Sequence, residues 1–287
     1  MHFSRIVSTL GLLALLAVPA QASDFGLLLP DRNIVDDPGQ KTLKLTLGAV
    51  DPFFGRGIPL ERPQSFSVLH RNGEEINRSE HLSVLEETTA YGTKAWTTEV
   101  ALPTPGAYHF IMQSKAIWQP EENRFTQYTV KVQVPAHGSS TGWDMASGTG
   151  LEITPLSRPF GMCAGMSFTG QVMRDGKPVA GALLEAARLD PSAKIDAPPL
   201  PEDGKDARGK NRSKPPVPLS SFQPVQELKA DSQGIFTFAC PTPGWWVFAS
   251  DVESDPLKDP EGNLKPLRCK AEFWLYLDDC SSSGKKR

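Results

Sequence analysis

The stretch FTQYTVKVQV, residues 125–134, alternates apolar and polar side chains from Tyr128 to Val134. A period of two residues is typical of a β-strand with one buried face. Similar runs, bounded by Gly, Pro, Asn and Asp, precede it, and helical periodicity is nearly absent. These runs are KTLKLTLGAV (41–50), QSFSVLHRNGEEI (64–76), AWTTEVAL (95–102) and GAYHFIMQS (106–114). We therefore predict an all-β protein, with a first β-sandwich over residues 23–136.

A second pattern of short strands follows in the later half of the chain. FTGQVMRDGKPVAGALLEAARL (168–189) predicts two strands joined by a tight turn at Asp175 and Gly176. Together with ADSQGIFTFACPTPGWWVFAS (230–250), it resembles the transthyretin-like modules known as carboxypeptidase regulatory-like domains. The resemblance implies a transthyretin-like β-sandwich over residues 165–280, and we expect an immunoglobulin-like sandwich before it.

Three segments lack the alternation. Gly, Ser and Pro accumulate from residue 137 to 159, so we place a linker at residues 137–164. Residues 190–224 are rich in Pro, Lys, Asp and Gly, and we expect a mobile loop there because such a segment has little apolar surface to bury. The tail 281–287 is expected to be disordered.

The amino-terminal segment has the features of a secretory signal peptide. Residues 1–22 combine Arg5, a short apolar run and the small residues Ala20 and Ala22. We predict cleavage before Ser23 and export to the periplasm, without direct membrane insertion. The full sequence has 30 basic and 33 acidic residues with a net charge of −3, which does not favour nucleic acid as a partner.

The four cysteines all lie in the second half of the chain: Cys163, Cys240, Cys269 and Cys280. An oxidising compartment allows two disulfides, and the sequence permits three pairings. We expect at least one bridge, with Cys269 to Cys280 closing a hairpin across FWLYLDD as a candidate.

The residues carry no recognisable catalytic motif. There is no phosphate-binding loop, HExxH or CxxC pair, so we predict a protein that is not an enzyme. The histidines of the mature chain occur singly. In GAYHFIM, His109 lies on the opposite face of the strand from Tyr108 and Phe110, which predicts a surface or rim position.

One loop offers adjacent carboxylates. In IWQPEENRF (117–125), Trp118 and Pro120 precede Glu121 and Glu122 at the tip of a predicted turn. Such pairs ligate divalent cations in some proteins and are solvated in more of them.

Six motifs follow one another along most of the mature chain. They are DFGLLLPD (24–31), DPFFGRGIPLERPQSFSVLHRNG (51–73), KAWTTEVALPTPGAYHF (94–110), IWQPEENRFTQYTVKVQVPAHGSSTGWD (117–144), EITPLSRPFGMCAGMSFTGQVMRDGKPVAGALLEA (152–186) and ADSQGIFTFACPTPGWWVFA (230–249). Their order resembles a family of periplasmic proteins, itself a domain-of-unknown-function family, whose members are accessory, substrate-binding components of nickel and cobalt uptake transporters. The resemblance implies a transition-metal ion as cargo and membrane transporter components as partners.

This chain departs from the family where the resemblance places the metal ligands. Family members carry histidines at positions that are Asp24 and Asp51 here, and no histidine follows near Gln127. Either carboxylates have replaced imidazoles in an oxygen-rich site, or the site is lost and the scaffold is a metal-free protein-interaction module. A carbohydrate-binding accessory is a third interpretation, drawn only from the exposed aromatic residues of a sandwich. The predicted metal ligands are Asp24, Asp51, His109, Glu121 and Glu122.

Overall fold

The computed structural model describes residues 24–37, 39–52, 55–120, 122–148, 150–189 and 225–280. In this part of the chain every regular element is a β-strand apart from the short 3₁₀ helix η1 (Leu82–Val84), so the predicted all-β class is confirmed. The predicted signal peptide, the loop 190–224 and the tail 281–287 lie outside the described residues. Within the described residues, no helix has the length and apolar character needed to cross a membrane.

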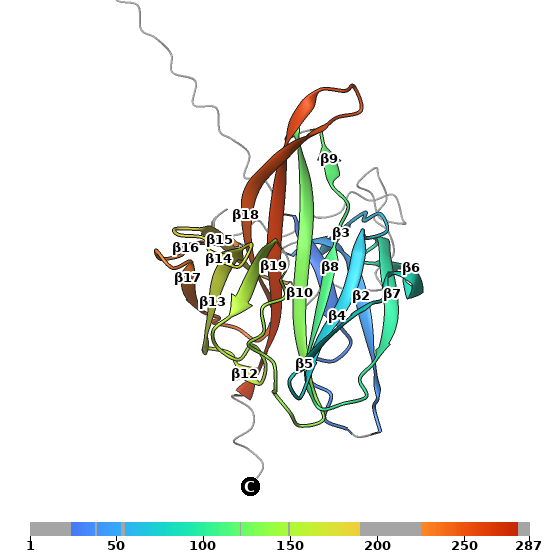
Figure 1. The fold of residues 1–287 in the computed structure, drawn as a ribbon, viewed down its shortest axis with the longest axis vertical. Helices are drawn as coiled ribbons and strands as arrows, with labels where there is room; N and C mark the ends of the chain where they lie inside the picture. Colours follow the sequence, from blue (N-terminus) through green and yellow to red (C-terminus); the bar gives the residue numbers. More distant parts are fainter. Residues whose placement is uncertain are drawn as a thin grey trace, which may run out of the picture.

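The strands form three sheets (Figure 1). The five-stranded sheet has the order β1-β2-β7-β6, with β3 beside β2. Its strands are β1 (Phe25–Pro30), β2 (Thr42–Asp51), β3 (Arg56–Ile58), β6 (Glu86–Ala90) and β7 (Thr93–Ala101). The four-stranded sheet contains β11 (Leu151–Pro155), β13 (Ser167–Arg174), β14 (Lys177–Pro178) and β17 (Ile235–Ala239).

The ten-stranded sheet joins the two halves of the chain. Its order is β16-β15-β18-β19-β10-β8-β4-β5, with β9 beside β10 and β12 beside β19. The central joint is a parallel ladder between β10 and β19, in which Phe125 pairs with Leu267 and Val132 with Trp274. Its strands are β4 (Ser65–Asn72), β5 (Glu75–Glu80), β8 (Gly106–Gln113), β9 (Ile117–Gln119), β10 (Arg124–Ala136), β12 (Met162–Cys163), β15 (Leu183–Arg188), β16 (Val225–Lys229), β18 (Gly244–Lys258) and β19 (Leu264–Asp278).

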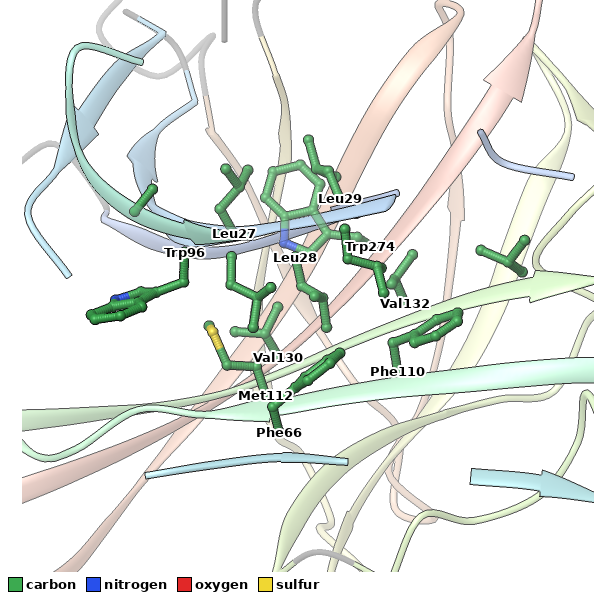
Figure 2. Close-up of a cluster of buried hydrophobic side chains, with 14 of the residues drawn as sticks. Leu27, Leu28, Leu29, Phe66, Trp96, Phe110, Met112, Val130, Val132 and Trp274 are labelled. Atoms are coloured by element: carbon green, nitrogen blue, oxygen red, sulfur yellow. The ribbon is translucent and has the colours of Figure 1, made fainter. Parts of the chain in front are cut away.

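Both faces of this large sheet are covered. Trp274 belongs to a core shared with β1, β2 and β7, whereas its neighbours Phe273 and Leu275 belong to a second core shared with β11, β13 and β17. Because neighbouring residues of a strand point to opposite faces, the two smaller sheets lie on opposite sides of the large one. Figure 2 shows the first core, where Leu27 and Leu28 of β1 lie among side chains of the large sheet.

Two local features agree with the predicted architecture. The Tyr108 hydroxyl donates to the Thr104 carbonyl oxygen at 2.9 Å and accepts from the Thr104 amide at 3.1 Å. This is the tyrosine corner found in immunoglobulin-like sandwiches. Asp175 and Gly176 both have positive φ, 51° and 74°, as the predicted tight turn between β13 and β14 requires.

The segment predicted as a linker contains ordered strands. β11 and β12 both lie within residues 137–164, and β11 pairs with β13 over five residues, from Leu151 with Arg174 to Pro155 with Gly170. The division into two domains stays a prediction, and the hydrogen-bonded ladder between β10 and β19 joins residues assigned to the first domain with residues assigned to the second.

The cysteine pairing differs from the predicted candidate. Cys163 is joined to Cys280, with the Cα atoms 5.5 Å apart, and Cys240 and Cys269 are free. Cys269 to Cys280 was the wrong pair because residues 264–278 form one strand rather than a hairpin. The extended strand from Cys269 to Asp278 alone spans about 30 Å, far beyond the reach of a disulfide.

Candidate functional site

The start of β1 brings two predicted ligands together. In the antiparallel ladder of β1 and β2, Phe25 pairs with Val50, so the preceding residue, Asp24, stands opposite Asp51 at the end of β2. Directly opposed residues of a ladder have neighbouring side chains on one face. Asp51 is only 2% exposed, and Asp24 is half-buried.

A third acid, Glu122, acts on the charge of Asp24. Burial and the negative charges of Asp51 and Glu122 together raise the pKa of Asp24 to about 6, against the opposing effect of Lys270 and Arg56. We call Asp24, Asp51 and Glu122 the acidic cluster. Glu121, the fourth predicted carboxylate, lies outside the described residues.

Basic side chains surround the acidic cluster. Arg124 Nε lies 2.9 Å from a carboxylate oxygen of Glu122, and Arg268 lies 3.7 Å from the same oxygen. Lys270 Nζ donates to the backbone oxygen of Asp24 at 2.9 Å. The carboxylates are therefore partly neutralised by the protein itself. Among the described residues, no three His, Cys, Asp or Glu side chains are arranged so that they hold a metal ion.

His109 is not a rim residue. It is 0% exposed, because the four-stranded sheet and the segment before it cover this face of the large sheet. Its Nε2 lies 2.8 Å from the carbonyl oxygen of Gly142, to which it donates, and its Nδ1 lies 3.3 Å from the amide nitrogen of Gln133. Burial, reinforced by the charge of Lys131, lowers the pKa of His109 to about 3. Both ring nitrogens are engaged, on the opposite face from the acidic cluster.

Sequence reasoning missed the contribution of β19 to this site. Arg268, Lys270 and Glu272 are charged at every second position, so they share the face of β19 that meets β1. This period-two pattern was the signal available in LRCKAEFW. Trp274, next on the same face, donates its indole N–H to the backbone oxygen of Gly26 at 2.8 Å.

Glu272 lies beneath β1. Its side chain is fully buried, and a Cβ built on Gly26 would come within 2.9 Å of its Oε2. Glycine at position 26 is therefore what allows β1 to lie directly on this carboxyl group. Burial raises the pKa of Glu272 to about 8, and Lys270, 3.8 Å away, opposes the rise.

We expect Glu272 to make the stability of the fold depend on pH. A glutamate whose folded pKa is about 8, against 4.5 when it is exposed to water, stays protonated in the folded state while the unfolded chain ionises. Its stabilising contribution is therefore complete below pH 4.5 and is lost as pH rises through 8, at about 1.4 kcal/mol per pH unit. Urea denaturation of wild type and Glu272→Gln from pH 5 to 8 should show this difference. An identical pH slope in both proteins would contradict it, and Glu99→Gln, an exposed acid, is the control.

Comparison with known proteins identifies a family. A family model described as "Domain of unknown function (DUF4198)" matches residues 20–254. No curated protein matches the chain. Among solved structures, the "D0-D1 domain of Intimin" aligns with 88% of this chain and 100% of that chain, at 11% sequence identity and a TM-score of 0.23.

Proposed function

This chain belongs to the DUF4198 family, and from that membership we propose that it is an exported periplasmic protein that binds a divalent transition-metal ion and presents it to a membrane uptake transporter. The binding is not enzymatic. The observation that carries the proposal is the opposed pair Asp24 and Asp51, with Glu122 close enough to raise the pKa of Asp24. The nickel and cobalt class is drawn from the resemblance of the sequence motifs to accessory components of such transporters.

The physical argument is that a cation relieves the repulsion within the acidic cluster. Asp24 has a pKa of about 6 because of burial and its negative neighbours, so its charged form is costly in the free protein. A bound divalent ion would favour that charged form. Carboxylate ligands in place of imidazoles predict weaker retention of nickel or cobalt than a histidine site provides. The free amino group produced by cleavage before Ser23 is a further candidate ligand.

We expect nickel and cobalt to bind the mature protein with micromolar affinity, measured by isothermal titration calorimetry. Asp24→Asn and Asp51→Asn should each weaken binding about tenfold or more, because each removes a charged ligand. Affinity should also fall as pH drops through 6, where the Asp24 carboxyl takes up its proton.

The control for these variants is Glu99→Gln, which changes the net charge equally at an exposed position of β7. Binding that survives both aspartate substitutions would move the site away from β1. No binding of nickel, cobalt or zinc at micromolar concentrations would reject the metal proposal.

A metal-free protein-interaction module is the second candidate function. It is supported by Arg124, Arg268 and Lys270, which already compensate the carboxylates at β1. In that case the charges serve to fasten β1 to β19, and the titrations above give no heat with any of the three metals. The melting temperature of Asp24→Asn would then differ from that of wild type, and neither protein would bind nickel, cobalt or zinc.

A further inference from the structure

A concave site lies at the opposite end of β19 from the acidic cluster. A pocket of about 370 Å³ is formed by the loop around Trp143 and by residues 157–167, which include β12. β12 pairs with β19 at Leu277 and Asp278. These residues are at least seven positions beyond Lys270, or about 23 Å along an extended strand. The pocket is therefore separate from the site at β1.

The inner wall of this pocket is apolar. Phe160 is 6% exposed and Met162 is 3% exposed, so both form a buried apolar wall. Met166 is 49% exposed and lies at the rim. Trp143 adds a half-buried aromatic ring. Flat aromatic rings and a flexible thioether suit an apolar or aromatic group of a small ligand.

Two donor side chains of the pocket, Arg158 and Trp143, have no hydrogen-bond partner among the residues that the structure describes. The Arg158 guanidinium lies 5.8 Å from the centre of the Phe160 ring. It makes no hydrogen bond or ion pair to any residue that the structure describes, and neither does the indole N–H of Trp143. Among the described residues, no acidic side chain lines the pocket. A positive charge and a free N–H beside an apolar wall are complementary to a negatively charged group on an apolar body.

We propose that this pocket binds a small organic anion with an aromatic or otherwise apolar body. The Arg158 guanidinium pairs with the anionic group, the Trp143 indole N–H donates to it, and the body lies against Phe160 and Met162. A hydrogen bond to a charged group contributes more than a neutral one, so the ionic contact is expected to dominate selectivity between charged and neutral ligands of equal shape.

The test uses two fluorescent probes that differ by one charged group, 1-anilinonaphthalene-8-sulfonate and the uncharged N-phenyl-1-naphthylamine. We expect the sulfonate to bind the wild-type protein at least about tenfold more tightly than the neutral amine. Arg158→Met should abolish that preference while leaving the affinity for the neutral amine within about twofold, and Arg158→Lys should keep most of the preference. Arg174→Met removes another exposed arginine and is the matched control.

Energy transfer from Trp143 locates the bound probe. Excitation of the protein should produce probe emission that falls in Trp143→Phe. Equal affinities for the two probes in the wild-type protein would overturn the proposal. So would a sulfonate affinity that Arg158→Met leaves unchanged, or energy transfer that Trp143→Phe leaves unchanged. Because Arg158 is exposed, the variants are expected to keep the wild-type melting temperature, which is measured alongside.

Discussion

Glu152→Ala should lower the free energy of unfolding by about 3–5 kcal/mol, because it leaves a buried lysine without its counter-charge. Lys131 Nζ lies 3.0 Å from Glu152 Oε2, and the two side chains are 4% and 6% exposed. Lys131 belongs to β10 and Glu152 to β11, so the pair fastens the four-stranded sheet to the large sheet.

The carboxylate of Glu152 also closes the loop before β11. It accepts from the Ser147 amide at 2.8 Å, from the Ser147 hydroxyl, and from the Gly148 amide at 3.1 Å. Burial alone would raise its pKa, but the charge of Lys131 and the bonds from Ser147 outweigh burial and hold the pKa below its usual value. We therefore expect Lys131→Met to lower the free energy of unfolding less than Glu152→Ala does, because the Glu152 carboxylate keeps its other hydrogen-bond donors.

A double variant separates the ion pair from the packing around it. Lys131→Met with Glu152→Gln removes both charges but keeps an acceptor for Ser147, so we expect it to recover about 2 kcal/mol relative to Glu152→Ala. Urea denaturation measures the free energy of unfolding of Glu152→Ala, Lys131→Met and the double variant. Arg174→Ala, which breaks an exposed ion pair with Asp175, should cost less than about 1 kcal/mol. A loss for Glu152→Ala as small as that of this control would contradict the expectation.

The class of the fold was predictable from local pattern, whereas its assembly was not. The alternation in FTQYTVKVQV lies within β10, and the Asp175-Gly176 pair forms the predicted turn. The parallel pairing of β10 with β19 joins residues more than a hundred positions apart, and no local pattern encodes it. In a sheet that is covered on both faces, side chains on both sides of a strand are buried, so alternation no longer separates core residues from surface residues.

That covered second face explains where side-chain predictions failed. Alternation placed His109 opposite the core residues Tyr108 and Phe110, which is correct, but the opposite face is buried too. The same holds for β18, where Val247 faces one core and Phe248 the other. A strand that is buried on both sides still alternates between its two faces. The alternation does not show that the second face is covered by another sheet rather than by water.

The candidate site was predicted in part. Asp24 and Asp51 were predicted to lie close together, and the register of β1 and β2 sets them opposite each other. Lys270 and Arg268 come from the far end of the chain and reach the site only through the pairing of β10 and β19. Because that pairing was not predictable, neither was the neutralisation of the carboxylates.

Removing the Cys163–Cys280 disulfide should destabilise the protein by about 2–5 kcal/mol. The bond closes a loop with a sequence separation of 117, and a cross-link over so long a loop removes much conformational freedom from the unfolded chain. It also holds β12, a strand of only two residues, against the end of β19. So short a strand has few hydrogen bonds of its own, so the covalent link should account for much of its order.

The measurement is urea denaturation of Cys163→Ser with Cys280→Ser, compared with wild type in the absence and presence of a thiol reductant. Reduced wild type should unfold at the same urea concentration as the double variant, and the reductant should not shift the variant further. Cys269→Ala, which removes a free thiol, should stay within about 1 kcal/mol of wild type and keep the full response to reductant. A disulfide between other cysteines would instead leave the double variant responsive to the reductant. Because β12 forms part of the pocket beside Trp143, reduction should also weaken binding of the aromatic sulfonate, which links the order of this end of the fold to its binding capacity.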